Sequence, residues 1–468
     1  MKGSELMLRL RRPKKVYSYN EVYNFIRQHE AQMYHDYKLL AYYEGRNTEI
    51  NKKVRSEGKS NIKASHPFAS KLVDTFTGYF SSKPVKYDTD NKMVLEMIDD
   101  YLKYNDSEEA LITLTRDACI YGCSATMTFL DAKGNVRFCP VNNSELIVIT
   151  DNSVLEEIHT VIRHWKVENN SGVRETHYVE VYTATDVTKY YIETENGEVK
   201  ETTQPQIMEH YFQDVPFSIF QFNDGKGLFQ RVIPLIDSYD LAVSNTLDLS
   251  NDLVDAILLV SGCVLDDTMI QQIRELRMLN ASEDIKVEYV QNNLPTNEDI
   301  KTRLREDIFS LAGIVDLEDK NWGSASSGVA LRLRMASTEF KASVTQGHFI
   351  KALRRNLELM LNLKALTNSI DVDSELREIK ITMQRNAIAN ETEQIQNALQ
   401  LSTMLSKQTI IGLLQDFVPS TDIELARLEE ERAESISFMS DFQSDSFHDE
   451  EDTEEEQEQE VEDEEVGE

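Results

Sequence analysis

Residues that interrupt regular secondary structure are scarce in this chain of 468 residues. Its 17 glycines and 9 prolines make up under half of the share of about 12% that soluble proteins usually devote to these two residues. Few interruptions leave room for long helices, so we expect a helix-rich protein. The length is enough for about three domains with sizeable buried cores.

Cysteine is scarcer still. Four cysteines, Cys119, Cys123, Cys139 and Cys263, are too few and too irregularly spaced for a disulfide framework. Cys119 and Cys123 stand four residues apart, but no second pair of Cys or His follows at the spacing of a zinc site. We interpret these two as small buried side chains in a protein of a reducing compartment.

Long apolar runs are also missing, and the longest extend over only a few residues. Residues 1–17 are basic but contain no apolar stretch of the kind found in a signal peptide. The pattern therefore predicts no transmembrane helix and no export, and we expect no contact with a membrane.

Catalytic signatures are absent as well. The sequence has no GxxxxGK[ST], HExxH, GxSxG or paired CxxC motif, and its nine histidines are scattered. The acid pairs Asp99-Asp100, Asp266-Asp267 and Glu318-Asp319 are candidate Mg²⁺ ligands, but in a chain with 82 acids such pairs arise by chance. We predict no catalytic residue, metal or cofactor, and hence no enzyme. A metal-dependent nuclease acting through these pairs remains the alternative.

The charge is strongly negative, with 49 basic against 82 acidic residues and a net charge of −33. This excludes a monomer that binds nucleic acid by neutralising phosphates over a broad surface. Residues 441–468 hold sixteen acids and no Lys or Arg, so we predict a disordered acidic tail. The remainder of the chain still carries −17.

Hydrophobic periodicity divides the first half of the chain into helices and strands. It predicts helices over 18–45 and 67–80, a short strand at 85–87 and a helical region over 91–121. Alternating patterns then predict strands at 125–130, 136–139, 146–149, 160–165, 178–183 and 189–193. Asn196-Gly197 is the strongest hairpin signal. We expect one antiparallel sheet flanked by helices within a single domain.

The second half returns to helical periodicity. It predicts a helix over 228–257, a compact insertion with a strand at 285–290, and a helix over 297–311, followed by a loop to residue 328. Apolar residues from Val329 to Leu363 then recur along one face of a helix over 328–366, about 58 Å long, with Gly347 as its expected bend. This helix carries a net charge of +5. One strand at 376–384 and shorter helices at 389–435 complete the prediction.

One segment is more specific than these patterns. His66 to Phe80, HPFASKLVDTFTGYF, followed by Lys83-Pro84-Val85, resembles the signature of portal proteins of tailed bacteriophages, the type found in long-tailed phages of Gram-positive hosts. Tyr42-Tyr43-Glu44-Gly45 and Tyr121-Gly122-Cys123-Ser124-Ala125 fit the same family, as does the order of helix, small insertion, helix, loop and very long helix. The resemblance covers roughly residues 18–440.

The resemblance implies a helix-rich α+β portal fold. It divides the chain into a basic N-terminal arm (1–17), a wing domain (18–227), stem helix 1 (228–257), a small α/β clip (258–296), stem helix 2 (297–313), a tunnel loop (314–328), the long helix of wing and channel (329–375), a helical crown (376–440) and the acidic tail (441–468).

The same resemblance implies a homo-oligomeric ring, commonly of twelve subunits, at one vertex of the capsid. Its partners would be double-stranded DNA in the central channel, the terminase large subunit, the head-tail adaptor protein, and the major capsid and scaffolding proteins. The protein would reside in the virion, and in the host cytoplasm during assembly. Without the resemblance, an acidic scaffolding or interaction protein remains open.

The site residues follow from this assignment. The tunnel-loop candidates are Asp316, Leu317, Glu318, Asp319, Lys320, Asn321 and Trp322. The candidates on stem helix 2 are Lys301, Arg303 and Arg305, and the clip docking candidates are Asp266, Asp267, Gln271, Arg274 and Arg277. A basic face of the long helix, which we expect to pair with acids of a neighbouring subunit in preference to DNA, consists of Arg332, Arg334, Lys341, Lys351, Arg354 and Arg355.

Charge gives the loop its expected role. Its three acids and one lysine leave −2 per subunit, about −24 in a ring of twelve. A negative wall repels phosphates and lets a duplex slide, whereas the cations of stem helix 2 would act only as brief footholds. An ordinary solvent loop is the alternative, just as the tail at 441–468 either keeps the protein soluble or lies over the crown and repels packed DNA.

Overall fold

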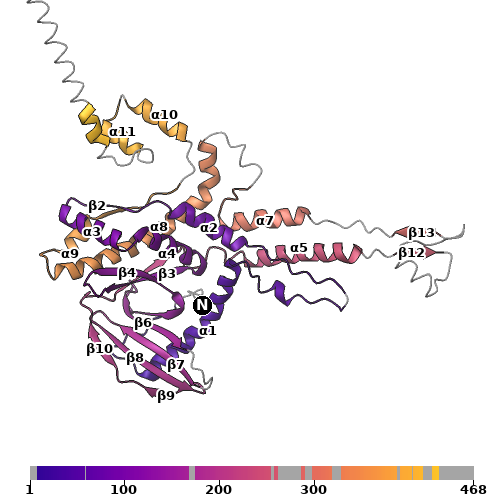
Figure 1. Cartoon of the computed structure of the whole chain (residues 1–468), viewed down its shortest axis with the longest axis horizontal. Helices are drawn as coiled ribbons and strands as arrows, with labels where there is room; N and C mark the ends of the chain where they lie inside the picture. The colour runs from indigo at the N-terminus through magenta and orange to yellow at the C-terminus, as the bar shows by residue number, and fades with distance from the viewer. Residues whose placement is uncertain are drawn as a thin grey trace, which may run out of the picture. The chain divides into compact units, whose positions relative to one another are not determined.

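The computed structural model describes residues 8–57, 59–167, 174–254, 258–261, 286–289, 298–318, 328–386, 391–402, 404–414 and 424–431. Contacts divide the chain into two compact units. The first comprises Met1–Ser324 and Arg332–Ala387, and the second comprises Ala325–Leu331 and Ile388–Glu468. The fold is the predicted α+β arrangement of helices with mainly antiparallel sheets (Figure 1).

Helix α1 (Tyr19–Tyr43) shows how the local sequence sets its ends. Ser18 accepts a hydrogen bond from the Glu21 amide, and the Glu21 carboxylate accepts one from the Ser18 amide, which forms a capping box. At the other end Gly45 takes φ +77°, a left-handed conformation that stops the helix. The predicted helix over 18–45 is thus confirmed.

The predicted helical region over 91–121 is two helices. Asn105 follows the end of the first, and Asp106 has φ +46°, which no helix tolerates. The helices between α1 and the first long strand are α2 (Phe68–Phe80), α3 (Lys92–Tyr104) and α4 (Ser107–Tyr121).

Two sheets replace the single sheet that we expected. The larger has the order β1-β5-β6-β7-β8-β10 with β9 also paired to β8, and the smaller has the order β11-β3-β4. The strands are β1 (Leu8–Leu10), β3 (Cys123–Leu130), β4 (Val136–Val141), β5 (Leu146–Thr150), β6 (Ile158–Val167), β7 (Arg174–Tyr182), β8 (Asp186–Glu195), β9 (Glu198–Thr202), β10 (Gln206–Glu209) and β11 (Phe217–Gln221).

Strand β1 lies within the residues predicted to form a basic arm. It pairs in parallel with β5, with Leu8 opposite Ile147 and Leu10 opposite Ile149. Three residues with one alternation give too short a pattern to predict a strand, and no local sequence signal specifies a partner this far along the chain. The rest of the large sheet is antiparallel, as predicted.

The turn between β8 and β9 confirms the strongest hairpin signal. Asn196 and Gly197 have φ +52° and +78°, the two positive values that a type I′ turn requires. The sequence also predicts a turn at Ser171-Gly172, which lies outside the described residues.

The main core joins segments that are far apart in sequence. Phe76 and Phe80 of α2 stack on each other, and Phe349 packs edge-on against Phe80 and against Phe220 of β11. All four rings are at most 1% exposed. A second cluster lies between α1 and the large sheet, where Val22 and Ile26 contact its strands. Phe349 belongs to the predicted long helix, so this helix runs through the centre of the core.

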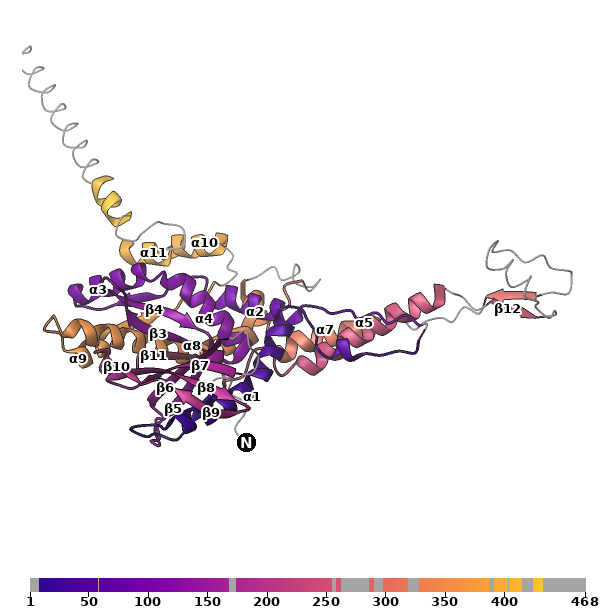
Figure 2. The same cartoon turned by 60° about the horizontal axis from the view of Figure 1, so that its bottom comes forward.

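Two helices lie side by side away from the sheets, α5 (Ile233–Val254) and α7 (Glu298–Ala312) (Figures 1 and 2). They correspond to the predicted helices over 228–257 and 297–311. Between them, β12 (Leu258–Ser261) pairs with β13 (Lys286–Tyr289) as an antiparallel pair. The sequence also predicts a short helix around 269–279 within this insertion, which lies outside the described residues, as do the five clip candidates.

The long helix is confirmed as α8 (Gly328–Ala365), 38 residues in length. Its predicted apolar row is only partly buried. Leu357 and Met360 of this row lie in the core, but Leu333, Phe340 and Val344 are 73%, 72% and 51% exposed. After α8 come α9 (Val372–Glu378) and β14 (Lys380–Thr382), which pairs with β2 (Lys86–Asp88), so the predicted strand over 376–384 is shorter than expected.

The second unit is helical where it is described. It contains α10 (Glu391–Leu401) and α11 (Lys407–Leu413), in agreement with the helices predicted over 389–435. The acidic tail lies outside the described residues. Within the described parts of the chain, no helix is both long and apolar enough to cross a bilayer.

Candidate functional site

The chain leaves α7 through a tight turn that begins the predicted tunnel loop. Gly313 has φ +66°, and Ile314 donates a backbone hydrogen bond to the Phe309 carbonyl at 3.1 Å. Ile314 is buried in the main core, which anchors the turn. The structure describes this loop up to Glu318, so Asp319, Lys320, Asn321 and Trp322 lie outside the described residues.

Two side chains of α8 close the carbonyl end of α7. The Lys341 ammonium donates to the Ala312 carbonyl, and the Thr338 hydroxyl donates to the Gly313 carbonyl at 3.3 Å. A cation at a helix C-terminus also interacts favourably with the helix dipole. Burial lowers the Lys341 pKa. Since a Cβ on Gly313 would lie 3.2 Å from Lys341 Cε, glycine lets the two elements approach this closely.

Four charged residues form an ion network beside this junction. Arg305 of α7 contacts Asp316 at 2.8 Å and Glu318 at 3.1 Å. Lys71 of α2 contacts Glu318 at 2.6 Å and Asp316 at 3.9 Å. The hydrogen bond from Lys71 lowers the Glu318 pKa, so this carboxylate stays ionised. Both cations also lie over the Phe309 ring. We call this network, together with Lys341 and Thr338, the loop base.

The loop base changes the predicted charge of the tunnel loop. Asp316 and Glu318 supply two negative charges, and Arg305 and Lys71 compensate both within the same chain. The repulsive wall predicted from the sequence is therefore not provided by these two acids. Lys71 lies 245 residues before Asp316 in the sequence, so no local pattern could have revealed this pairing.

The three cations predicted on stem helix 2 have different environments. Lys301 pairs with Glu298 at 2.8 Å and is largely covered, and Arg305 belongs to the loop base. Arg303 is 82% exposed with Asp307 at 3.8 Å. Of the three, Arg303 is the one that presents its charge to solvent.

The predicted basic face of α8 needs a correction. Arg355 donates to the carbonyls of Phe217 and Val215 at 2.8 and 3.1 Å and pairs with Asp214 at 2.8 Å. Lys341 belongs to the loop base. Both side chains therefore stabilise their own chain and are not available to a neighbouring subunit.

Of the other four residues of the predicted basic face, the structure describes the side chains of three. Lys351 and Arg354 are exposed, and Arg334 is half-buried. The Arg332 side chain lies outside the described residues. A basic contact with a neighbour therefore reduces to Lys351 and Arg354 among the described cations.

Among the described residues, the acid pairs do not assemble a metal site. Asp99 and Asp100 are exposed on α3, and Glu318 is bound by two cations. Across the described parts of the chain, no group of three or more His, Cys, Asp or Glu side chains is arranged to hold a metal ion. Asp266, Asp267 and Asp319 lie outside these parts.

The segment from His66 to Phe80 connects all of these elements. His66 contacts Asp240 of α5 at 2.7 Å, Phe68 packs edge-on against Phe309 of α7, and Lys71 holds Glu318 of the loop. Phe76 and Phe80 are in the core with α8. The segment that carries the family resemblance is thus in contact with α5, α7, the residues that follow α7, and α8.

Comparison with known proteins agrees with this architecture. The model of the family "Phage portal protein, SPP1 Gp6-like" matches residues 23–437. The chain belongs to this family of phage portal proteins. The portal protein of Bacillus phage SPP1 is 24% identical over 391 residues, covering 80% of this chain and 76% of the relative. The portal protein of Clostridium phage phiCD119 is 22% identical over 386 residues, covering 75% and 83% respectively.

These findings confirm the resemblance read from the sequence, including its link to phages of Gram-positive hosts. As a portal protein the chain is a structural component of a phage capsid. Sequence reasoning identified the loop and its helices in this portal protein. It missed Lys71 and Thr338, although Lys71 lies within the segment that carries the resemblance.

Proposed function

We propose that twelve copies of this portal protein form a ring at one capsid vertex. Its central channel would conduct double-stranded DNA during packaging and ejection. The role is that of a conduit and docking platform and includes no catalysis. Supporting observations are the match to the portal family over residues 23–437 and the helical order that follows. Terminase and, later, a head-tail adaptor would dock on the clip at 258–296, and capsid and scaffolding proteins around the wing.

The loop base is the observation that carries this proposal. Elements α2, α7 and α8 meet where the loop at 314–328 begins, and each contributes side chains that fix its first residues. A loop held so firmly at its base projects from a defined position. This arrangement suits a loop that meets DNA at the same height in every copy of a ring.

Oligomeric mass tests the ring. Twelve copies of a 53.8-kDa chain weigh about 650 kDa, and native mass spectrometry of the full-length protein should find this species. Negative-stain images should show an annulus with a hole that admits a duplex. A compact monomer, or a closed particle without a hole, would contradict the proposal and favour the scaffolding alternative.

The loop base itself gives a second expectation. Replacing Arg305 by Met keeps the length of the side chain but leaves Asp316 and Glu318 with Lys71 as their cationic partner in this network. We expect amide exchange of residues 313–318 to rise a few-fold and DNA packaging to fall, while rings still form. The effect is moderate because these ion pairs are partly exposed.

Arg303→Met is the matched control for this experiment. Arg303 lies two residues away on the same helix, is 82% exposed and does not belong to the loop base, so its loss should leave the amide exchange of residues 313–318 unchanged. Equal amide exchange of residues 313–318 in the two variants would show that the loop base does not hold the loop. Loss of rings in Arg305→Met would show that Arg305 serves assembly instead.

A further inference from the structure

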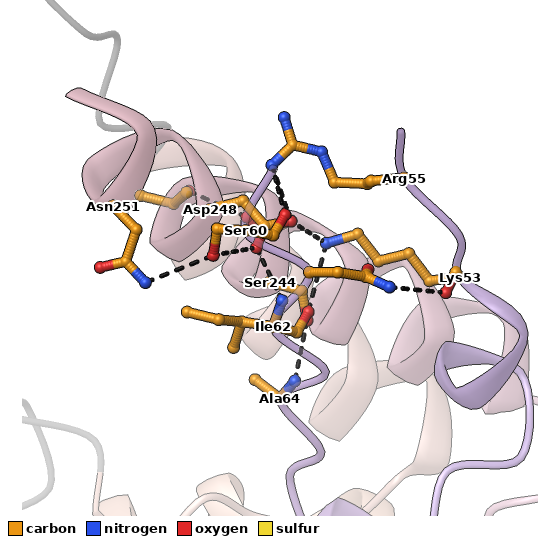
Figure 3. Close-up of polar contacts among 11 residues, drawn as sticks. Lys53, Arg55, Ser60, Ile62, Ala64, Ser244, Asp248 and Asn251 are labelled. Atoms are coloured by element: carbon orange, nitrogen blue, oxygen red, sulfur yellow. Dashed lines mark hydrogen bonds and ion pairs between the residues drawn. The ribbon is translucent and has the colours of Figure 1, made fainter. Parts of the chain in front are cut away.

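The segment between α1 and α2, residues 46–67, runs along the stem helix α5, and we call it the strap (Figures 2 and 3). On α5, Asp240, Ser244 and Asp248 stand four residues apart and therefore share one face of the helix. The side chains of all three residues are polar, and the residues are at most 1% exposed. Buried polar groups need partners, and the strap supplies them.

Between Ile62 and His66, every second backbone amide of the strap donates to one of these side chains. The Ile62 amide donates to Asp248 at 2.7 Å, the Ala64 amide to Ser244 at 2.9 Å, and the His66 amide to Asp240 at 3.1 Å. Two residues of extended chain advance about 6.6 Å, and four residues of helix advance about 6.0 Å. One straight segment can therefore meet the same helix face three times, and we call these contacts the ladder.

Side chains reinforce both ends of the ladder. Lys53 and Arg55 pair with Asp248, and the Ser60 hydroxyl donates to it at 3.1 Å (Figure 3). Burial opposes ionisation of Asp248, but the Ile62 amide and Lys53 outweigh it, so the pKa lies below its usual value. At the other end, Asn47 donates to Asp240 at 2.7 Å.

Among the described side chains of α5, apolar packing is concentrated in the first two turns. Ile233 and Ile236 are buried there and Tyr239 packs edge-on against Phe68, whereas Leu241, Leu247 and Leu249 further along are each at least 41% exposed. An amphipathic helix is usually oriented by its apolar stripe, and here the polar ladder takes that place. Leu241, Asn245 and Leu249, each one position beyond a ladder residue and so about 100° further around the helix, are exposed and uncharged.

We propose that the strap is a positioning element that fixes the orientation of α5, holding Asp240 and Asp248 inward and leaving an uncharged face outward. The ladder selects one rotation of the helix, because a turn about the helix axis would break all three rungs together. The ladder needs no assembly. The role of the ladder in a channel rests on the proposed function. In a ring, release of the strap would expose the carboxylates of Asp240 and Asp248 on every copy of α5.

Hydrogen–deuterium exchange of the full-length protein tests this assignment. Asp248→Ala should accelerate exchange more than tenfold in peptides covering 60–66 and 241–254, because a rung and both ion pairs are lost together. Peptides from β6 and β7 should stay unchanged and report that the wing is folded. The matched control is Lys63→Met, since Lys63 is exposed and donates to Asn51 within the strap, whereas Lys53 reaches Asp248.

A conservative variant separates a ladder from a simple charge contact. Asp248→Asn combined with Lys53→Gln keeps an acceptor for Ile62 and removes the main ion pair, and it should restore slow exchange. Fast exchange in this double variant, or slow exchange in Asp248→Ala, would overturn the proposal. If Asp248→Ala fails to fold, Ser244→Ala removes only the middle rung and gives the same comparison. Failure of the wild-type protein to form rings would contradict the proposed function, but the hydrogen–deuterium exchange comparison would still test the ladder, because the ladder lies within one chain.

Discussion

Gly122→Ala should destabilise the protein by more than about 3 kcal/mol, since two severe penalties combine at this position. Gly122 has φ +89°, which L-residues rarely adopt, and a Cβ there would lie 2.3 Å from the Gly225 carbonyl oxygen. The clash is with backbone, and that backbone is fixed because the Phe222 amide donates to the Gly122 carbonyl at 2.9 Å. Urea unfolding followed by circular dichroism measures the loss.

Two other glycines frame this measurement. At Gly227, on the other side of the same contact, a Cβ would lie 2.3 Å from the Ile120 carbonyl oxygen, so Gly227→Ala should be similarly damaging. Gly78 lies within α2 with no atom within 4 Å of a Cβ, and Gly78→Ala should gain up to about 1 kcal/mol. Equal stability of Gly122→Ala and Gly78→Ala would contradict the close approach.

Acid should weaken the packing of α1 on the large sheet. His29 and His164 are at most 4% exposed, and their rings share a hydrogen bond of 2.7 Å between Nδ1 and Nε2. Burial lowers the pKa of His29 to about 4 and that of His164 to about 3. The unfolded chain takes up protons near pH 6.5, and the folded chain does not. Stability is therefore full above pH 6.5 and falls toward pH 4, by up to about 1.4 kcal/mol per pH unit for each histidine.

The measurement is the urea midpoint between pH 7 and pH 5, compared between the wild type and His164→Gln. The comparison is needed because burial raises the pKa of Asp36 in α1 to about 7. The contribution of Asp36 to the free energy of unfolding therefore changes with pH in the direction opposite to that of the histidines. The charged residues Glu30, Glu175 and Lys166 near His177 are present in both the wild type and the variant, so their effect on the pH dependence of stability is common to both. The difference in urea midpoint between the two proteins reports the effect of replacing His164. The variant should lose less stability than the wild type as pH falls. Parallel curves would contradict a buried neutral pair.

Periodicity and local turn residues predicted the elements whose signals lie within a few residues. Apolar spacing with a stop at Gly45 predicted α1, and Asn196-Gly197 predicted a hairpin, whereas the capping box of Ser18 and Glu21 was recognised only in the structure. The absence of proline and the helical spacing of apolar residues predicted a helix over 328–366, and α8 ends one residue earlier, at Ala365. Fold class followed from these elements in order.

Partners distant in sequence could not be predicted in the same way. Strand β1 was missed because three residues give no period, and the pairing of Lys71 with Glu318 depends on how α2 and the loop meet in space. The charge of the tunnel loop was counted from the loop alone, so the cations that pair with Asp316 and Glu318 were missed. Lys341 was recognised as basic, whereas its role of closing α7 required knowledge of which turn of α8 passes that helix.

The outward side of the first half of α8 has a thermodynamic consequence. Leu333, Phe340 and Val344 keep much of their apolar area in water when one copy stands alone. Water penalises each such side chain by roughly 25 cal/mol for every Å² that remains wet. Coverage by another surface would release this free energy, so an assembly that covers these three side chains is expected to lose stability on dilution.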